Sequence, residues 1–285
     1  MNYRSISNSP PLLKLKKTRR KIFLKKILLY LIALLVIFAG LALISRIDRL
    51  NISEIKTAGN KVTDGDMIQA SVKQTIAGNY FFVFPKSNIF YYPKNQIKQD
   101  LLDKFKALED ATFAIREQKT LEISVTEREA LYTWCGEKIN SEDKCYFMDK
   151  SGFLINEAPY FSGEVYFRFY GLINGAQAGN PSGSYFSPQN FDKLILFKEA
   201  IESIGLTPVA LSIDASEDAE IFLSGKTQGT GPKIIFKLDS DYLSVAENLQ
   251  AALSTEPLLS NFKNKYSSLS YIDLRFGNKV YYKFK

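Results

Sequence analysis

The chain of 285 residues has the hydrophobic and charged content of a globular protein, but its net charge of +7 is unevenly distributed. Residues 1–26 hold nine of the 37 basic residues and no acidic one, so the 28 basic residues that remain face 30 acidic ones. A nucleic-acid-binding protein should carry its positive charge on the folded part, so this distribution argues against that function. The absence of histidine excludes histidine-based catalytic triads and histidine-ligated metal sites.

An uncharged apolar stretch at residues 27–44 predicts a transmembrane helix. At about 1.5 Å per residue, roughly 20 such residues cross a hydrocarbon core of about 30 Å. Residues 39–42 (AGLA) are weakly permissive for signal-peptide cleavage, but the stretch exceeds a usual signal sequence, which favours a retained anchor over 27–45. By the positive-inside rule, the basic residues before it predict a cytoplasmic tail at 1–26 and an extracytoplasmic location for the remainder.

A small α+β domain is predicted at residues 50–126. A strand within 52–62 ends at the turn signal Gly59 and Asn60, and Thr63 is the expected N-cap of a first helix. The order that follows is helix, helix, strand, strand, which predicts a three-stranded sheet covered on one face by two helices.

The later elements of this domain follow from periodicity. A second helix is expected over 94–105, and two strands with alternating apolar residues over 111–117 and 121–126. Between the two helices, residues 81–84 (FFVF) form an apolar patch that ends at Pro85. The sequence alone assigns no role to this patch.

Residues 127–285 predict a second, mostly antiparallel β-domain with two helices. The helices are expected over 187–204 and 241–253, whereas the Gly-, Ser-, Pro- and Asn-rich residues 174–188 predict a loop and residues 226–231 a turn. Strands are expected over residues 131–134, 210–213, 220–223 and 233–238, with hairpins over 146–155 and 270–282.

The two cysteines, Cys135 and Cys145, lie ten residues apart between two strand-like segments. The turn-rich sequence between them predicts a hairpin, which a disulfide could clip in an oxidising compartment. Two free buried thiols are the alternative. Because the closed loop is short, the disulfide would stabilise the fold by a few kcal/mol at most.

Several segments, taken in order, resemble the POTRA domain and β-domain of the FtsQ/DivIB family of bacterial cell-division proteins. The likeness covers nearly the whole chain, although Glu129 and Ala130 occupy a region where a proline is usual, and Gln118 and Lys119 lack the usual proline before the strand. It is carried by Ile52, Ile55, Gly59, Asn60 and Val62 in the opening strand, by residues 121–128 (LEISVTER) with Ala130 and Trp134, by the Asp149–Gly152 turn, and by residues 270–282 (SYIDLRFGNKVYY).

The resemblance implies a non-enzymatic scaffold at the bacterial division septum, anchored by a single pass and without cofactor or small-molecule substrate. It would link the cytoplasmic and cell-wall sides by binding other single-pass and polytopic membrane division proteins. A small coiled-coil partner would add a strand to the last strand of this chain, whose far edge nothing adjacent in sequence covers. The implied partner-binding residues are Lys279, Val280, Tyr281, Tyr282, Lys283 and Phe284.

Other interpretations remain open. The last strand could be a plain edge guarded by its lysines. Glu127 and Arg128 are adjacent in a strand and point to opposite faces, so a structural role is favoured over catalysis, and Asp273 and Arg275 share a face on which an ion-pair network is expected. A membrane-anchored enzyme acting on wall polymers would need paired carboxylates or an activated serine in a cleft, and a POTRA-type translocation module would usually carry POTRA repeats and a membrane β-barrel.

Overall fold

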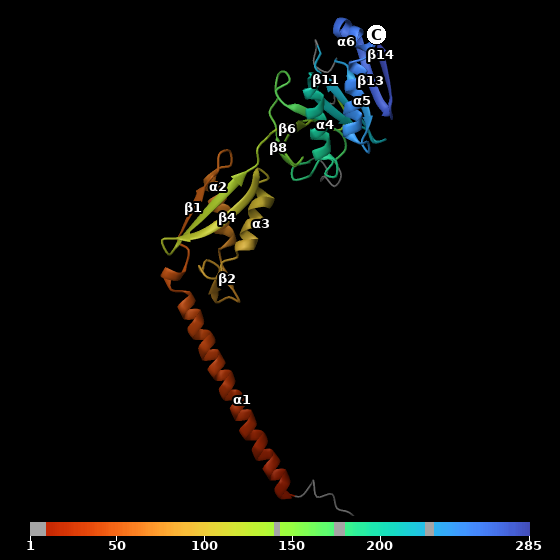
Figure 1. Cartoon of the computed structure of the whole chain (residues 1–285). Coiled ribbons are helices and arrows are strands. Elements are labelled where there is room, and N and C mark those ends of the chain that lie inside the picture. Colours follow the sequence, from red (N-terminus) through yellow and green to blue (C-terminus); the bar gives the residue numbers. More distant parts are fainter. Residues whose placement is uncertain (1–9, 140–142, 174–179, 226–230) are drawn as a thin grey trace, which may run out of the picture. The chain divides into compact units, whose positions relative to one another are not determined.

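The computed structural model describes residues 10–139, 143–173, 180–225 and 231–285 (Figure 1). It is a mixed α/β protein with one apolar N-terminal helix and a large, mostly antiparallel sheet. The chain divides into two compact units, which are described separately. The first holds residues 1–60, 64–101 and 111–125, and the second holds residues 61–63, 102–110 and 126–285.

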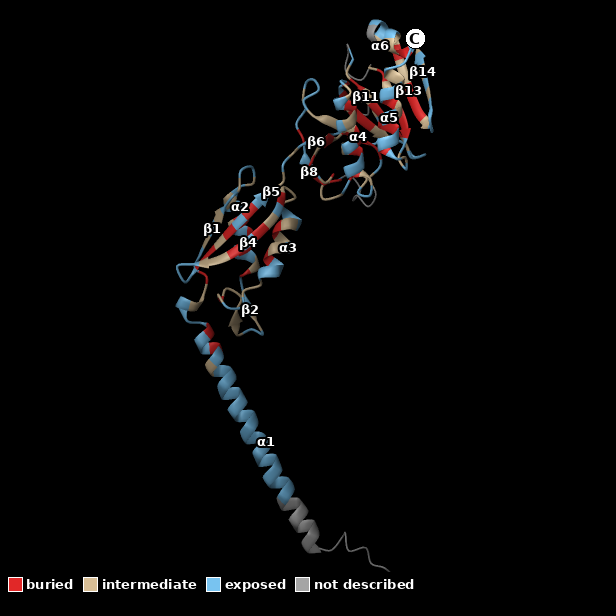
Figure 2. Cartoon of the chain, in the orientation of Figure 1, coloured by how far each residue is buried: buried red, intermediate tan, exposed pale blue. Residues whose placement is uncertain are grey.

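Helix α1 (Pro10–Ser45) contains the segment Arg19–Ser45, which is long and apolar enough to cross a membrane. The described side chains of this segment are almost all exposed (Figure 2). Ala42 and Ser45, near the C-terminal end, are the buried ones in this segment. A helix that is apolar on every side requires an apolar environment, so this exposure is consistent with single-pass membrane anchoring.

A three-stranded sheet with order β1-β5-β4 forms the centre of the folded region at residues 48–127, called the first fold below. Strand β1 is parallel to β5. Along β5, Leu121, Ile123 and Val125 are buried and alternate with more exposed residues, so one face of the sheet is covered. The expected order strand, helix, helix, strand, strand is present, with a short hairpin β2-β3 added between the helices. The elements are η2 (Asp48–Leu50), β1 (Glu54–Ala58), α2 (Gly65–Thr75), β2 (Asn79–Tyr80), β3 (Phe84–Pro85), α3 (Lys94–Lys104), β4 (Leu108–Arg116) and β5 (Thr120–Glu127).

The cap of α2 differs from the prediction by one residue. Asp64 is the N-cap, and its carboxylate accepts a hydrogen bond from the backbone N–H of Asp66 at 2.8 Å. Thr63 instead donates its own N–H to Glu127 at 2.8 Å. The prediction was wrong because Thr63 and Asp64 are both good capping residues, and a distant carboxylate decides between them.

The large sheet has nine strands in the order β14-β13-β12-β11-β10-β9-β6-β7-β8. Three neighbouring pairs are parallel, namely β6 with β9, β9 with β10 and β12 with β13, and the others are antiparallel. The strands are β6 (Tyr132–Trp134), β7 (Tyr146–Met148), β8 (Leu154–Glu157), β9 (Phe167–Tyr170), β10 (Pro208–Ile213), β11 (Asp218–Leu223), β12 (Lys233–Lys237), β13 (Leu269–Phe276) and β14 (Lys279–Phe284).

Helices α4 (Phe191–Ser203) and α5 (Tyr242–Leu253) supply the buried apolar residues that complete the core of this sheet. Two predictions were wrong here. The domain has a third helix, α6 (Leu258–Lys265), followed by η3 (Tyr266–Ser268), because a helix of eight residues offers too few turns to show a clear period. Helix α4 also begins at Phe191 rather than Ser187, since Ser187 has a positive φ of 43° and accepts turn hydrogen bonds from Asn190 and Phe191.

Three predicted connections lie partly outside the described residues, namely 140–142 between the cysteines, 174–179 of the loop and 226–230 of the turn before β12. Residues 1–9 of the predicted basic tail also lie outside them. The described remainder of the loop runs beside β8. Gly183 donates its N–H to the Leu154 carbonyl at 2.8 Å, and Leu154 donates to the Ser184 carbonyl at 2.9 Å.

Candidate functional site

Strand β14 is the outermost strand at one end of the nine-stranded sheet (Figure 1). It pairs with β13 in an antiparallel register, with Ile272 opposite Tyr282 and Asp273 opposite Tyr281. In the part of the chain that the structure describes, no other strand pairs with β14, so the N–H and C=O groups of its outer edge have no strand partner there. Such an edge can accept an extended segment of another chain.

The two faces of β14 differ in their availability. Val280, Tyr282 and Phe284 are partly buried and pack against the main core. Lys279, Tyr281 and Lys283 point to the other face and are exposed. Val280, Tyr282 and Phe284, although predicted to bind a partner, therefore hold the strand against the core.

Tyr281 is the aromatic residue of β14 that is exposed, at 51%, and it lies against Phe276 of β13 with ring centroids 5.3 Å apart. Phe276 is itself 55% exposed. The two rings form an apolar patch on the open face beside the free edge, called the Tyr281–Phe276 patch below. Phe276 was not among the predicted residues, although its place directly before the Gly277–Asn278 turn identifies it as a cross-strand neighbour.

A charged cluster fixes strand β13 beside this patch. Arg275 donates to both carboxylate oxygens of Asp273, at 2.9 Å and 2.6 Å, and also bonds Asp218 at the start of β11. Burial opposes ionisation of Asp273, but the hydrogen bonds from Arg275 outweigh it and hold the pKa of Asp273 below its ordinary value. The same hydrogen bonds, to Asp273 and Asp218, raise the pKa of Arg275. The ion-pair network predicted from Asp273 and Arg275 is therefore present.

Glu127 and Arg128 contact different partners, and Arg128 lies just after β5, which ends at Glu127. The carboxylate of Glu127 accepts N–H groups from Val62 at 2.9 Å and Thr63 at 2.8 Å. Burial favours a higher pKa for Glu127, but these backbone donors outweigh it and lower the pKa. These hydrogen bonds secure the end of β5 to the loop before α2. They give Glu127 a structural role that it does not share with Arg128.

Arg128 forms a largely buried ion pair with Asp149, in the turn between β7 and β8. Its Nη1 lies 2.6 Å from Asp149 Oδ2, and its guanidinium stacks 3.9 Å from the ring centroid of Phe153. Asp149 also accepts the N–H groups of Ser151 and Phe153 and the hydroxyl of Ser151. This turn, one of the segments that carry the family resemblance, is thus built around one buried carboxylate.

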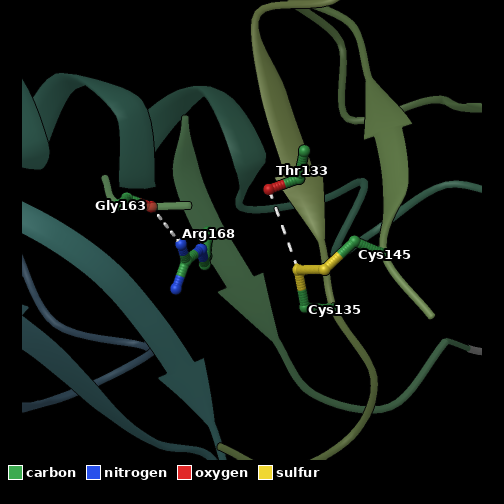
Figure 3. The surroundings of a disulfide bond; sticks show 5 residues. All are labelled: Thr133, Cys135, Cys145, Gly163 and Arg168. Carbon is green, nitrogen blue, oxygen red and sulfur yellow. Dashed lines mark hydrogen bonds between the residues drawn. A yellow bond between two sulfur atoms is a disulfide. The ribbon is translucent and has the colours of Figure 1, made fainter. Parts of the chain in front are cut away.

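Cys135 and Cys145 form a disulfide that joins the ends of β6 and β7 (Figure 3). The antiparallel pairing of Trp134 with Tyr146 places the two cysteines opposite each other. Thr133 Oγ1 lies 3.8 Å from Cys135 Sγ. The predicted pairing of the two strands is therefore present, and the cysteines form the disulfide rather than two free thiols.

A cavity of about 500 Å³ lies beside the disulfide, on the sheet face opposite the main core. This follows from alternation along β9, where Phe169 points into the core while Arg168 and Tyr170 line the cavity. Its carboxylates include Glu157, which pairs with Lys144 at 2.9 Å, and Glu164, which accepts the Ser224 hydroxyl at 3.3 Å.

The acidic residues that line this cavity are Asp143, Glu157 and Glu164. No group of three or more His, Cys, Asp or Glu residues that could hold a metal ion occurs among the described residues. The described contacts of Glu157 and Glu164 are to different partners, a lysine and a serine, and not to each other.

Gly59 and Asn60 form the turn that the sequence predicted after β1. Gly59 has a φ of +86°, and a Cβ there would lie 2.3 Å from the carbonyl oxygen of Val125. Both the left-handed conformation and the close approach of β5 require glycine. Its role in the first fold is therefore conformational.

Comparison with protein-family models and with curated proteins finds no match for this chain.

Proposed function

We propose that the chain is a non-enzymatic, single-pass membrane scaffold of the FtsQ/DivIB type, with a POTRA-like first domain, that acts at the bacterial division septum. Its basic tail would lie in the cytoplasm and its two folded units on the cell-wall side. The membrane-compatible helix, the βααββ order of the first fold and the terminal sheet edge support this proposal. The family resemblance supplies the cellular process.

One observation carries the proposed mechanism, namely the position of β14 at the edge of the sheet. Strand addition uses main-chain hydrogen bonds for affinity and side-chain contacts for specificity. The free edge would supply the former, and the Tyr281–Phe276 patch the latter. The proposed partner is a small membrane protein with a coiled coil, whose extended segment pairs with β14.

Site-specific photocrosslinking tests this mechanism. A photoreactive phenylalanine analogue at position 281, in the full chain in dividing cells, should crosslink to one small membrane protein with a heptad-repeat sequence. The same analogue at Tyr160, which is 91% exposed in the same unit but outside the strands, is the matched control.

Substitution gives an independent result. Tyr281→Asp places a charge in the patch but leaves the core side of β14 intact, so it should abolish the crosslink from a neighbouring position while the chain remains folded. Tyr160→Asp should leave the crosslink unchanged. Two results would contradict strand addition at this edge. One is equal crosslinking from positions 281 and 160, and the other is a partner crosslink that persists in the Tyr281→Asp variant.

A further inference from the structure

The short hairpin β2-β3 and the turn after it lie against the C-terminal end of α1. The ring centroids of Phe38 in α1 and Phe84 in β3 are 5.1 Å apart in an edge-to-face arrangement. Ala42 and Ser45, four and seven residues after Phe38, are buried and lie on the same face of the helix. This segment therefore covers two turns of α1.

Hydrogen bonds hold the segment in this position. The Ser45 carbonyl, at the end of α1, accepts the side-chain amides of Asn51 at 2.9 Å and Asn88 at 3.2 Å. Asn88 is 1% exposed, and Arg46 Nε donates to the Val83 carbonyl at 3.2 Å. These bonds satisfy a helix-end carbonyl and tie the hairpin to the helix.

The depth of the hairpin follows from the length of the apolar stretch. Between Lys26 and Arg46 there are 19 uncharged residues, which at 1.5 Å per residue span about 28 Å, close to the thickness of the hydrocarbon core. Arg46 must therefore lie at the membrane surface if α1 spans the bilayer. Phe38 then lies roughly 10 Å below Ser45 along the helix, and Phe84 lies beside it.

The hairpin presents large apolar side chains that the protein leaves uncovered. Phe81 is 82% exposed, Phe82 is 94% exposed, and Phe90, in the turn that follows, is 77% exposed. Aromatic residues concentrate at membrane interfaces, where apolar rings gain from contact with lipid. Lys86, whose Nζ lies 5.7 Å from the ring centroid of Tyr80, places a positive charge in the same segment.

The backbone at the tip of the hairpin is unusual for these residues. Phe81 and Phe82 have φ values of +47° and +62°, and Val83 donates its N–H to the Tyr80 carbonyl at 3.1 Å. A turn with two left-handed central residues favours Asn-Gly, and bulky residues there are outliers. Two phenylalanines at the tip therefore disfavour the turn itself, and their side chains gain nothing from the protein core.

We propose that the β2-β3 hairpin is a membrane-inserted wedge, in which Phe81, Phe82 and Phe90 enter the lipid leaflet nearest the folded units while Arg46 and Lys86 face lipid phosphates. The inference rests on the proposed membrane anchoring by α1. The wedge would fix the angle at which the first fold leaves the bilayer, because it attaches that fold to lipid at a second point. The occupant of this surface is the bilayer itself.

Tryptophan fluorescence in vesicles tests the wedge. The single native tryptophan is replaced by Trp134→Phe, and one reporter is introduced into the full chain at a time. Phe82→Trp and Phe90→Trp report on the hairpin, and Tyr30→Trp reports on the span. The chain is reconstituted into vesicles of phosphatidylethanolamine and phosphatidylglycerol, with or without brominated acyl chains, which quench tryptophan that they contact.

Met67→Trp is the matched control. Met67 is 53% exposed near the start of α2, and the Thr57 hydroxyl, which donates to the Gly65 carbonyl, places that start beside the far end of β1. The five residues of β1 therefore separate Met67 from the hairpin by about 17 Å. The two hairpin reporters and Tyr30→Trp should lose emission in brominated vesicles, and Met67→Trp should not.

The outcomes separate the wedge from the anchor. If Tyr30→Trp is quenched but neither hairpin reporter is, the anchor stands and the wedge is refuted. If Tyr30→Trp is not quenched either, both fail. Blue-shifted emission from Phe82→Trp that persists in brominated lipid would show the ring buried against protein, such as a second copy, and would also overturn the lipid assignment.

Discussion

The buried pair of Arg128 and Asp149 gives the largest single-residue stability effect that we predict. Asp149→Ala removes the partner of Arg128 and the acceptor for Ser151 and Phe153. The side chains of Arg128 and Asp149 are 14% and 5% exposed, so Arg128 would be left charged and largely buried. Breaking such a pair costs about 3–5 kcal/mol.

Urea unfolding of the full chain in detergent measures this cost. Trp134, the single tryptophan, lies in β6 next to β7 and reports on the unit that contains Asp149. Glu202→Ala is the comparison, since Glu202 pairs with Lys198 at 2.8 Å within α4, and its carboxylate side chain is 44% exposed, against 15% for Lys198 and 5% for Asp149. An ion pair between residues four apart on a helix contributes about 0.3–0.5 kcal/mol.

The pH dependence identifies the carboxylate as the cause. Burial opposes ionisation of Asp149, but the hydrogen bonds from Ser151, Arg128 and Phe153 outweigh it and lower the pKa of Asp149. A lowered pKa stabilises the fold above the unfolded-state value of about 3.9, and this contribution is lost as the pH falls through the folded-state value. The difference between wild type and Asp149→Ala should therefore shrink below about pH 4. A loss no larger than that of Glu202→Ala at neutral pH would refute the assignment.

Three further predictions concern the fold. Cys145→Ser, which leaves Cys135 unpaired, should lower the free energy of unfolding of the second unit by about 2–3 kcal/mol in the same urea assay, and an unchanged midpoint would contradict a disulfide in the native protein. Gly59→Ala should destabilise the first fold by about 2 kcal/mol or more, because its Cβ meets the Val125 carbonyl. Faster hydrogen exchange of β1 amides checks this, and exchange like that of wild type would argue against it. Arg275→Ala should cost about 2 kcal/mol by Trp134 fluorescence, and a neutral effect would show that the cluster contributes no net stability.

Local sequence patterns predicted the elements whose signal is contained in a few adjacent residues. The apolar stretch of α1, the alternation in β5 and the turn at Gly277 between β13 and β14 all depend on near neighbours. The cysteine hairpin belongs to the same class, because its two strands, β6 and β7, are consecutive in the sequence. These predictions needed no knowledge of distant contacts.

Apart from the short helix α6, the features that the sequence did not predict depend on tertiary pairing. The parallel contacts of β6 with β9 and of β12 with β13 join segments far apart in the chain, and periodicity does not specify such partners. The choice of Asp64 over Thr63 as cap depends on the distant Glu127. The apolar patch at residues 81–84 was visible in the sequence, but its contact with α1 was not.

The sequence predicted strand β14, but it did not show which of the strand's side chains meet the core. Alternation along β14 shows that Tyr281 lies on the opposite face from Tyr282 and Phe284, but the pattern alone does not say which face meets the core. The core cluster decides this, because it holds Tyr282 and Phe284 and leaves Tyr281 to pair with Phe276. The available apolar surface is therefore smaller than the three aromatic residues suggested, and it includes one residue from β13.

Depletion of the protein in the cells that encode it, followed by imaging of septa, tests the central claim most directly. The proposed scaffold function predicts long filaments without septa, restored to normal division by the wild-type chain and by Tyr160→Asp but not by Tyr281→Asp. Normal septation in depleted cells would contradict the division function, and full rescue by Tyr281→Asp would contradict the role of β14 in it.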